Sequence, residues 1–557
     1  MPDITQTAAW QALARHRRDT AGISIRDRFA AEPDRFARMH GQIHGLLADY
    51  SKNRIGEDTL SLLVSLAETA RLPQKMQAVW RGEPVNASEG RPALHAALRL
   101  PPDAPPVCAS GENILPEIRR ERERALDFAD RLISGAYANA DGLPFTDLVN
   151  IGIGGSDLGA RMAAAALAPY HTRLRVHFAA NADGAELSAA LAGLDLRRTL
   201  FALASKSFTT PETLLNAHAA RDWLRQGGVG ENELPRHFAA VSAHAEAAAA
   251  FGIAAENRFA MPEGVGGRYS VWSPVGLPLM AAVGSEHFRA FLAGGHAMDE
   301  HFFTAPLRRN LPAILGLIGI WYNNFHGAQT HAVVPYTHLL RHLPAHLQQL
   351  DMESNGKSVT QSGEPVACDT GSIFWGGEGV NSQHAFFQLL HQGTRLVPVD
   401  FIVPVNTPEA AQNRRFTAAN AFAQAEALML GKTAPAPPPQ HPAHRPPRPL
   451  HPRPAHRPVR TPHLRPGRRV GHQPLRPMGR AIRQNPGANH PLRTRRRRKP
   501  PPRPLHRRPD CPLPPAGQVR LAQRTYHARQ RFCLKKQKAR GRLKIVFHVF
   551  RRPPTLR

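Results

Sequence analysis

The stretch DLVNIGIGGSDLG (residues 147–159), which runs on into ARMAAAALA, decides the fold of this chain. Its first apolar run predicts a buried strand, and the alanine-rich continuation predicts a helix. Between them, Gly152, Gly154 and Gly155 permit positive φ angles and a close approach of the backbone. Ser156 opens the helix, where unpaired N–H groups and the helix dipole favour an anion. This unit could hold a nucleotide, hold a phosphate or form only a tight turn, and it is not a Walker A loop because no Gly-Lys-Ser/Thr follows.

Strand and helix signals continue on both sides of this unit. The runs LRVHFAA, TLFALAS and PETLLNAHAARDWLR extend the alternation, which predicts an α/β fold with a parallel sheet. A second stretch, 281–432, repeats the mixture. Residues 7–100 have apolar positions at helical spacing, as in IHGLLADYSKNRI and DTLSLLVSLAETARL. We therefore expect a helical N-terminal region (1–110), a first α/β domain (111–280) and a second one (281–432) packed with 1–110.

A second loop favours a phosphate site. SKSFTTPET (205–213) follows the apolar run TLFALA and precedes another helix. Four hydroxyl groups, the ammonium of Lys206 and a helix N-terminus would together hold a phosphate dianion. Capping of the helix is the competing explanation, but a cap needs one hydroxyl group only. Two such loops in one α/β unit predict a sugar-phosphate or nucleotide site.

Three later segments carry residues suited to acid–base chemistry. GVGGRYSVWS holds Arg268, whose guanidinium could face an oxyanion from a glycine-rich turn. QQLDMESNGK holds Glu353 in what reads as a polar loop, and NSQHA holds His384 just before a helix. A carboxylate and a histidine are the usual groups of general acid–base catalysis. Each of the three, taken alone, could equally be a structural residue.

Charge divides the chain after Lys432. Up to that residue there are 39 Lys+Arg and 42 Asp+Glu, whereas residues 433–557 hold 33 basic residues and one acid. The basic region also has 27 of the 52 prolines and no sustained apolar period, so we expect it to be disordered. In the body, Cys108 and Cys368 fit no metal or redox spacing and are predicted to be buried, reduced thiols. The body shows no secretory signal and no apolar run of roughly 18 residues, so we expect a cytoplasmic protein without a membrane partner.

Together and in this order, the five segments closely resemble the glucose-6-phosphate isomerase family. NIGIGGSDLG, SKSFTTPET, GGRYSVWSPVGLP, QQLDMESNGK and NSQHAFFQLLHQGT match its hallmark stretches, and the similarity runs over residues 40–432. The resemblance implies two parallel-sheet domains of the flavodoxin-like sugar-isomerase (SIS) type. It also implies a homodimer and reversible conversion of glucose 6-phosphate to fructose 6-phosphate, a step of glycolysis and gluconeogenesis, with no metal or organic cofactor.

The same resemblance assigns roles to residues of this chain. Glu353 would move a proton between C1 and C2 of the sugar through a cis-enediol, and Arg268 would stabilise the enediolate oxygen. His384 would assist ring opening and reach the site of the neighbouring subunit. The substrate phosphate would be bound by Ser156, Ser205, Lys206, Ser207 and Thr210, with Gln349 nearby; the family more often has Thr at the position of Ser207.

The family also requires a catalytic lysine near its C-terminus, in a segment like WGINPFDQWG…GK, and this segment is absent here. A nucleotide sequence encoding VVWGINPFDQWGAQFGKT, when read two nucleotides later, gives RVGHQPLRPMGRAIRQN, which is residues 469–485 letter for letter. The codon of the missing lysine would straddle Gln484 and Asn485. We therefore predict that the chain is translated out of frame soon after Lys432, and that its isomerase activity is impaired.

Two other interpretations stay open at this point. Arg-rich disorder binds phosphate polymers, so residues 433–557 could be a nucleic-acid-binding appendage. Their few aromatic residues, Tyr526, Phe532, Phe547 and Phe550, lie outside the arginine run, which disfavours this reading. Alternatively, the body could be a non-catalytic sugar-phosphate sensor. Retention of Glu353 together with an arginine and a histidine favours an enzyme.

Overall fold

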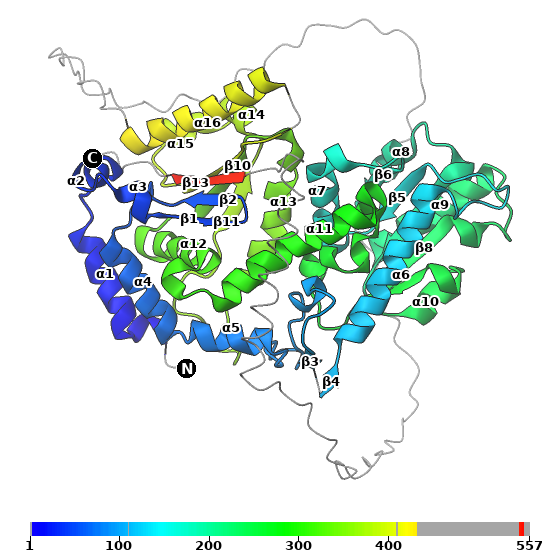
Figure 1. The fold of residues 1–557 in the computed structure, drawn as a ribbon, viewed down its shortest axis with the longest axis horizontal. Helices are drawn as coiled ribbons and strands as arrows, with labels where there is room; N and C mark the ends of the chain where they lie inside the picture. The colour runs from blue at the N-terminus through cyan, green and yellow to red at the C-terminus, as the bar shows by residue number, and fades with distance from the viewer. Residues whose placement is uncertain (1–2, 110, 408–409, 432–544, 551–557) are drawn as a thin grey trace, which may run out of the picture. The chain divides into compact units, whose positions relative to one another are not determined.

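A computed structural model describes residues 3–109, 111–407 and 410–431, and the backbone of 545–550 (Figure 1). All of these belong to one compact unit. The predictions for residues 433–557 concern residues that the structure does not describe, apart from the backbone of Ile545–Phe550. Ile545–Phe550 forms strand β13, in keeping with its run of β-branched and aromatic residues. Within the described part, no helix is both long and apolar enough to cross a bilayer.

The predicted parallel sheet around residue 147 is confirmed. Its five strands pair in the order β6-β5-β7-β8-β9, all parallel. The strands are β5 (Asp147–Ile151), β6 (Arg175–Ala179), β7 (Thr199–Ala204), β8 (Phe238–Ser242) and β9 (Arg258–Ala260). Every residue of β5 and β7 is buried, as expected for strands covered on both faces. The order along the sheet reverses between β5 and β7, which makes this the flavodoxin-like arrangement.

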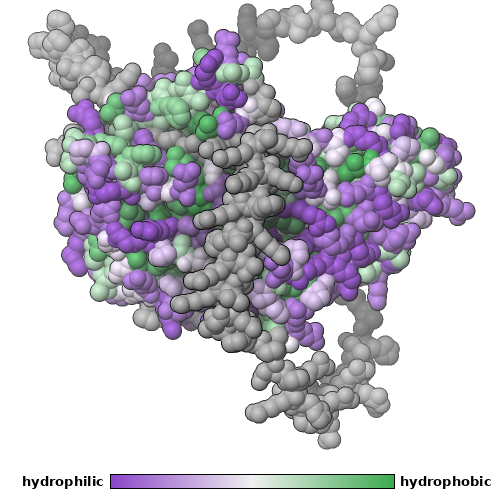
Figure 2. All heavy atoms as spheres, in the orientation of Figure 1, coloured by the Kyte–Doolittle hydropathy of each residue, from purple (hydrophilic) through white to green (hydrophobic). Residues whose placement is uncertain are grey.

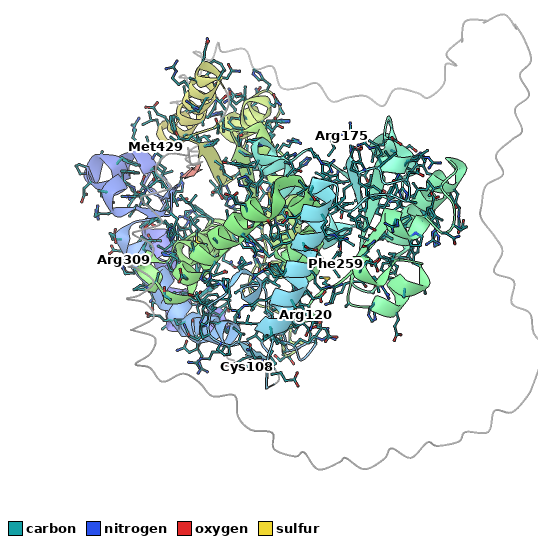
Figure 3. The ribbon with its side chains drawn as sticks, turned by 45° about the vertical axis from the view of Figure 1, so that its right-hand side comes forward. Cys108, Arg120, Arg175, Phe259, Arg309 and Met429 are labelled. Carbon is teal, nitrogen blue, oxygen red and sulfur yellow. The ribbon has the colours of Figure 1, made fainter. Side chains whose placement is uncertain are left out.

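Alternate residues of these strands face two separate cores. Leu148 and Leu200 pack in one cluster with α6 (Leu115–Ser134), α7 (Leu158–Ala166) and the long α11 (Leu277–Thr304). Phe259 of β9 lies against α6, with its ring 5.5 Å from that of Phe128 (Figure 3).

Val149 and Phe201 point to the other face. There they pack with α8 (Gly184–Leu191), α9 (Pro211–Gln226) and α10 (Ala245–Ala250). Polar residues make up most of the visible surface outside these cores (Figure 2).

The second sheet is mixed, so the prediction of parallel strands alone was incomplete. Its parallel part is β10 (Thr330–Pro335), β11 (Ile373–Gly376) and β12 (Val399–Pro404). The full order is β1-β2-β13-β12-β10-β11, in which β13 runs antiparallel to β12 and parallel to β2. The helices of this part are α12 (Leu311–Ile320), α13 (Leu343–Leu347), α14 (Gly379–Gln383), α15 (Phe387–Gln392) and α16 (Ala411–Leu430).

The prediction of helix for residues 43–55 is wrong. This segment belongs to a hairpin of β1 (His40–Ile43) and β2 (Leu46–Asp49), in which Ile43 pairs with Leu46. His44 and Gly45 form the turn with φ angles of 45° and 93°. Positive φ at both turn residues suits the twist of a two-residue hairpin, and that geometry outweighs the helical spacing of the leucines. The other N-terminal elements are helical, as predicted: α1 (Ala8–Asp19), α2 (Ile25–Ala31), α3 (Arg35–Arg38), α4 (Glu57–Thr69) and α5 (Leu72–Trp80).

The prediction for the cysteines was also wrong. Cys108 is disulfide-bonded, and Cys368 is free but only partly buried. Cys108 lies in the short strand β3 (Cys108–Ala109), which pairs with β4 (Glu112–Asn113), and its side chain is half-buried.

Buried Arg35 fixes the loop that follows β2. Its side chain is fully buried, and its Nε donates to the carbonyl oxygen of Ser51 at 2.6 Å. Its Nη2 donates to the carbonyl oxygens of Asn53 at 3.1 Å and Ile55 at 2.6 Å, and its Nη1 to Glu32 at 3.0 Å. Only a planar guanidinium can reach these four acceptors at once.

We expect Arg35→Lys to lower the free energy of unfolding by about 2–4 kcal/mol, because an ammonium leaves several of these acceptors buried and unpaired. Arg38→Lys is the matched control, since Arg38 lies on the same helix, pairs with the same Glu32 and is 37% exposed. It should change the same quantity by less than about 1 kcal/mol. Urea unfolding measures both, and equal effects of the two substitutions would contradict this role of Arg35.

Candidate active site

The two predicted phosphate loops meet at the point where the strand order reverses. The glycine loop follows β5 and the SKSFTTPET loop follows β7, and these strands are neighbours. A Cβ on Gly152 would lie 3.0 Å from the carbonyl oxygen of Ala204, which shows how closely the two loops approach. Ligands of open α/β sheets bind at this position, beyond the carboxyl ends of the strands.

Hydrogen bonds within the second loop gather its hydroxyl groups. Ser205 is buried, and its Oγ lies 3.0 Å from Oγ1 of Thr210 and accepts from the backbone N–H of Phe208 at 3.1 Å. Phe208 is itself buried with a φ of 52°, which turns the backbone sharply. Thr210 is the N-cap residue of α9 but makes no side-chain cap bond, and its hydroxyl contacts Ser205 instead. Oγ of Ser207 accepts from the Thr209 hydroxyl at 2.7 Å.

A third turn presses against the glycine loop. A Cβ on Gly155 would lie only 2.1 Å from the carbonyl carbon of Gly267, so both backbones touch here. A Cβ on Gly154, whose φ is 60°, would lie 3.1 Å from Nε2 of Gln349. These contacts bring the loop of Ser156, the turn that carries Arg268 and the segment of Gln349 together.

Arg268 and Glu353 form an ion pair beside this contact. Nη1 of Arg268 donates to Oε1 of Glu353 at 2.8 Å, and Nε donates to Oγ of Ser354 at 2.7 Å. The arginine side chain is 20% exposed and the glutamate 53%, so the carboxylate faces solvent while the guanidinium is held from behind. The hydroxyl of Tyr269 also contacts Oγ of Ser354, at 2.7 Å.

Glu353 lies in a π-helical turn, Gln348–Glu353, rather than in the predicted loop. The turn continues α13. Its wide winding places Gln349 toward the glycine loop and Glu353 toward Arg268. Sequence analysis missed Ser354 and Tyr269, although both are immediate neighbours of predicted residues. Contact between segments about 85 residues apart leaves no local signal.

Two predicted residues make no bond to the ion pair in the described part of the chain. Nζ of Lys206 makes a long contact of 3.5 Å with the carbonyl oxygen of Glu263, in the turn between β9 and the segment of Arg268. His384 ends α14, its side chain is exposed, and within the described residues it makes no side-chain hydrogen bond. Among the described residues, no hydrogen bond or ion pair joins His384 to Glu353.

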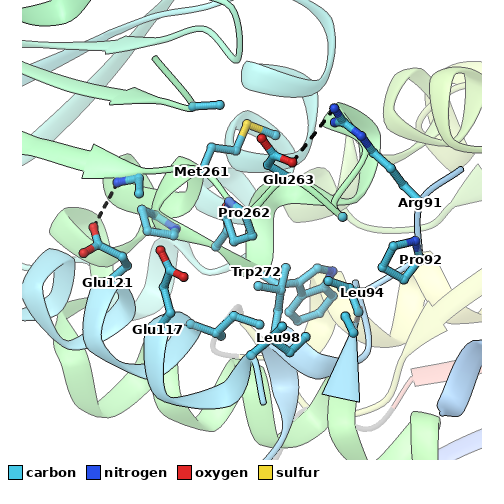
Figure 4. Close-up of a pocket in the computed structure, with 18 of the residues that line it drawn as sticks. Arg91, Pro92, Leu94, Leu98, Glu117, Glu121, Met261, Pro262, Glu263 and Trp272 are labelled. Carbon is cyan, nitrogen blue, oxygen red and sulfur yellow. Dashed lines mark hydrogen bonds and ion pairs between the residues drawn. The ribbon is translucent and has the colours of Figure 1, made fainter. Parts of the chain in front are cut away.

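A cavity of about 400 Å³ lies behind the segment that precedes Arg268 (Figure 4). Leu94, Leu98 and Trp272 line much of it, and none of the predicted site residues does. One of its carboxylates, Glu121, already accepts from the backbone N–H of Ala260 at 2.9 Å. Three glutamates, Glu117, Glu121 and Glu263, line this cavity and would repel a phosphate, so the open surface between the three loops is the better candidate.

Asp157, next to Ser156, ties the glycine loop to its helix. Its carboxylate accepts from Nε of Arg161 at 3.0 Å, and Nη2 of Arg161 donates to Glu186 at 2.9 Å. Burial raises the pKa of Asp157 to about 6, and Arg161 opposes that shift only in part. The folded chain therefore binds a proton here more tightly than the unfolded chain, whose value is 3.8. The stabilisation from this proton is present below pH 3.8 and is lost as pH rises through 6.

The free energy of unfolding of the wild-type chain should fall as the pH is raised from 4 to 7. We expect this fall to be about 2 kcal/mol larger than in Asp157→Asn, because the asparagine cannot titrate. Urea unfolding at several pH values measures the two slopes. Asp127→Asn removes a carboxylate that is 70% exposed and should keep the wild-type slope. Equal slopes for the wild type and Asp157→Asn would contradict the role of this carboxyl.

Comparison with known proteins places the chain in a family. The model of the phosphoglucose isomerase family matches residues 49–438, ending close to the break after Lys432. Glucose-6-phosphate isomerase 2 of Neisseria gonorrhoeae is 61% identical over 428 residues, which are 77% of this chain and 78% of that relative. The protein of the same name from Chromobacterium violaceum is 52% identical over 432 residues, with the same two coverages.

A solved structure agrees with the sequence matches. The crystal structure of a glucose-6-phosphate isomerase from Chlamydia trachomatis superposes with a TM-score of 0.67 at 31% identity, covering 76% of this chain and 82% of that one. The region that the family model matches contains both sheets apart from β13, β1 and most of β2, and it includes all three loops of the site. With this fold, this site and these matches, the chain belongs to the phosphoglucose isomerase family.

Proposed function

We propose that the body of this chain, up to Lys432, is an aldose–ketose isomerase that interconverts glucose 6-phosphate and fructose 6-phosphate. The observation that carries this proposal is the 2.8 Å pair of Arg268 and Glu353 beside the two phosphate loops. Moving a proton next to a carbonyl group needs one carboxylate at the carbon and one cation where the oxygen becomes negative. Membership of the phosphoglucose isomerase family supports the same reaction.

In this proposal, the phosphate of the sugar binds between the loops after β5 and β7. The hydroxyl groups and backbone N–H groups come from Ser156, Ser205, Ser207 and Thr210, Lys206 supplies the charge, and Gln349 contacts the same pocket from the π-helical turn. The helices that begin after both loops add their N-terminal dipoles.

The sugar's C1 and C2 then lie over Glu353. This carboxylate takes the proton from one carbon and returns it to the other, so that a cis-enediol forms between the two steps. Arg268, held by Ser354 from behind, remains beside the oxygen on which negative charge develops. Because the guanidinium is fixed before the sugar binds, no reorganisation is required during the reaction.

His384 supports the further proposal of a homodimer. Its side chain is exposed and, among the described residues, forms no hydrogen bond with the ion pair of its own chain, as expected if it assists ring opening in the site of the neighbouring subunit. We also propose that the protein acts in the cytoplasm. The similar proteins give no support to a nucleic-acid-binding appendage or to a non-catalytic sensor. A measurement of turnover distinguishes the sensor from the enzyme.

We expect Glu353→Gln to lower kcat by about a thousandfold with little change in KM, because the amide keeps the shape of the site but cannot accept the proton. The measurement is a coupled assay with fructose 6-phosphate, made in the protein whose frame after Lys432 is restored. Glu364→Gln removes an exposed acid elsewhere on the same segment and should leave kcat unchanged. A kcat within tenfold of wild type for Glu353→Gln would overturn the proposed base.

We expect the chain with its present C-terminal sequence to turn over fructose 6-phosphate at least a hundredfold more slowly than the frame-restored protein. The physical reason is the loss of the lysine whose codon would straddle Gln484 and Asn485. The comparison uses the two full chains at equal concentration in the same assay, and sequencing of the gene around codon 433 identifies which one is made. Equal rates would show that the lysine segment is dispensable.

A further inference from the structure

A histidine and an aspartate form an ion pair between neighbouring strands of the second sheet. Nε2 of His331 on β10 lies 2.9 Å from Oδ2 of Asp400 on β12, and the histidine side chain is only 14% exposed. The ring stacks on that of Phe374 in β11, with 4.9 Å between the centroids and an angle of 11° between the planes. Because β10 pairs with both β11 and β12, the imidazole is fixed from two sides.

The same histidine acts on an acid of the π-helical turn. His331 interacts electrostatically with Asp351, which lies two residues before Glu353 in this turn. Burial alone would lower the pKa of His331, but Asp400 and then Asp351 outweigh it, so the pKa lies above its usual value. The two carboxylates therefore favour the charged form of the imidazole.

Asp351 in turn depends on this charge. Burial raises the pKa of Asp351, whereas the side chain of Asn355 and the charge of His331 oppose that shift. Among the described residues, Asp351 forms no ion pair with an arginine or a lysine. A half-buried carboxylate that loses its cation gains by turning toward water, and here it would move the turn that carries Glu353.

The two ends of the turn are held in different ways. Nε2 of Gln348, the first residue of the turn, donates to the carbonyl oxygen of Phe374 at 3.1 Å. This bond anchors the end near Gln349 to β11. The later part of the turn has the charge of His331 as its link to the sheet, through Asp351. Loss of that charge should therefore disturb Glu353 more than Gln349.

We propose that His331 is a positioning residue, which holds Asp351 and thereby keeps the carboxylate of Glu353 against Arg268. It acts through the π-helical turn and does not itself contact the sugar. This inference rests on the proposed function of Glu353 as the base. The competing explanation is a purely structural pair that ties β10 to β12.

The other sheet contains a matched pair of that structural kind. Nε2 of His177 on β6 lies 2.8 Å from Oδ1 of Asp147 on β5, again between neighbouring parallel strands. Asp147 also accepts from Nη2 of Arg175 at 2.7 Å, and it begins β5, at the end of the strand opposite to the glycine loop. His177→Gln is therefore the control for a histidine–aspartate pair without a link to the site.

The first test uses His331→Gln, which keeps a donor for Asp400 but removes the charge that acts on Asp351. We expect it to lower kcat for fructose 6-phosphate by about ten- to a hundredfold, with KM within about twofold of wild type. Adding Asp351→Asn should return kcat to within about threefold of wild type, because the carboxylate without a cation is then neutral. His177→Gln should leave both constants unchanged. The assays use the frame-restored protein, as for Glu353→Gln.

Amide hydrogen exchange of the full chain, with its present C-terminal sequence, gives a second measurement. His331→Gln should speed exchange about tenfold in peptides that cover Gln348–Ser354, because the turn opens more often without its link to the sheet. Adding Asp351→Asn should reverse this change. In His177→Gln the same peptides should exchange as in the wild type.

The outcomes distinguish this inference from the proposed function. A loss of kcat in Glu353→Gln but not in His331→Gln would overturn the positioning role and leave the proposed base intact. Full activity of Glu353→Gln would overturn the base and the role of His331 with it. Losses in His331→Gln that Asp351→Asn does not relieve, or a rise in KM as large as the fall in kcat, would identify a structural pair instead.

Discussion

The candidate site depends on one backbone contact, that of Gly155 with Gly267. Any side chain on Gly155 would overlap the carbonyl group of Gly267, so the two turns approach as closely as peptide groups allow. One turn ends the first strand of the parallel sheet and begins an anion-binding helix. The other presents Arg268. In the proposed function, their contact would fix the distance between the phosphate and the reacting carbons of a bound sugar, and a catalytic geometry needs that distance to be constant to within a fraction of an ångström.

The two halves of the site come from different parts of the fold. The parallel sheet and its helices supply hydroxyl groups, N–H groups and positive dipoles, which suit a phosphate but perform no proton transfer. The segment after α13 supplies Glu353, whose carboxylate remains accessible because Arg268 pairs with one oxygen only. Ser354, whose hydroxyl also contacts that of Tyr269, holds the guanidinium from the other side. In the proposed reaction, this division would let the phosphate provide binding energy while a separate pair of charges carries out the chemistry.

Prediction from sequence succeeded where the signal is local. The buried strands, the helices after each loop and the glycine turn follow from short apolar runs and from residues with special φ angles. It failed where a contact between distant segments overrides a local pattern. Residues 43–55 have helical spacing, yet the turn at Gly45 pairs two strands. Gln348–Glu353 looked like a loop, yet it extends α13 as a π-helical turn. Ser354 and the mixed order of the second sheet left no trace in the sequence.

The sequence by itself determined the family of this protein and the place where its composition changes. Residue types and their order predict a phosphate site, a base and a cation, and the change in charge after Lys432 is the basis for predicting a shift of frame there. Only the tertiary structure decided which of these groups meet, and it left Nε of Arg17 and Nε of Arg28 buried without a hydrogen-bond partner. The reason is physical: residue identity fixes what a group can do, whereas burial and distance, which arise from packing, decide whether it has a partner.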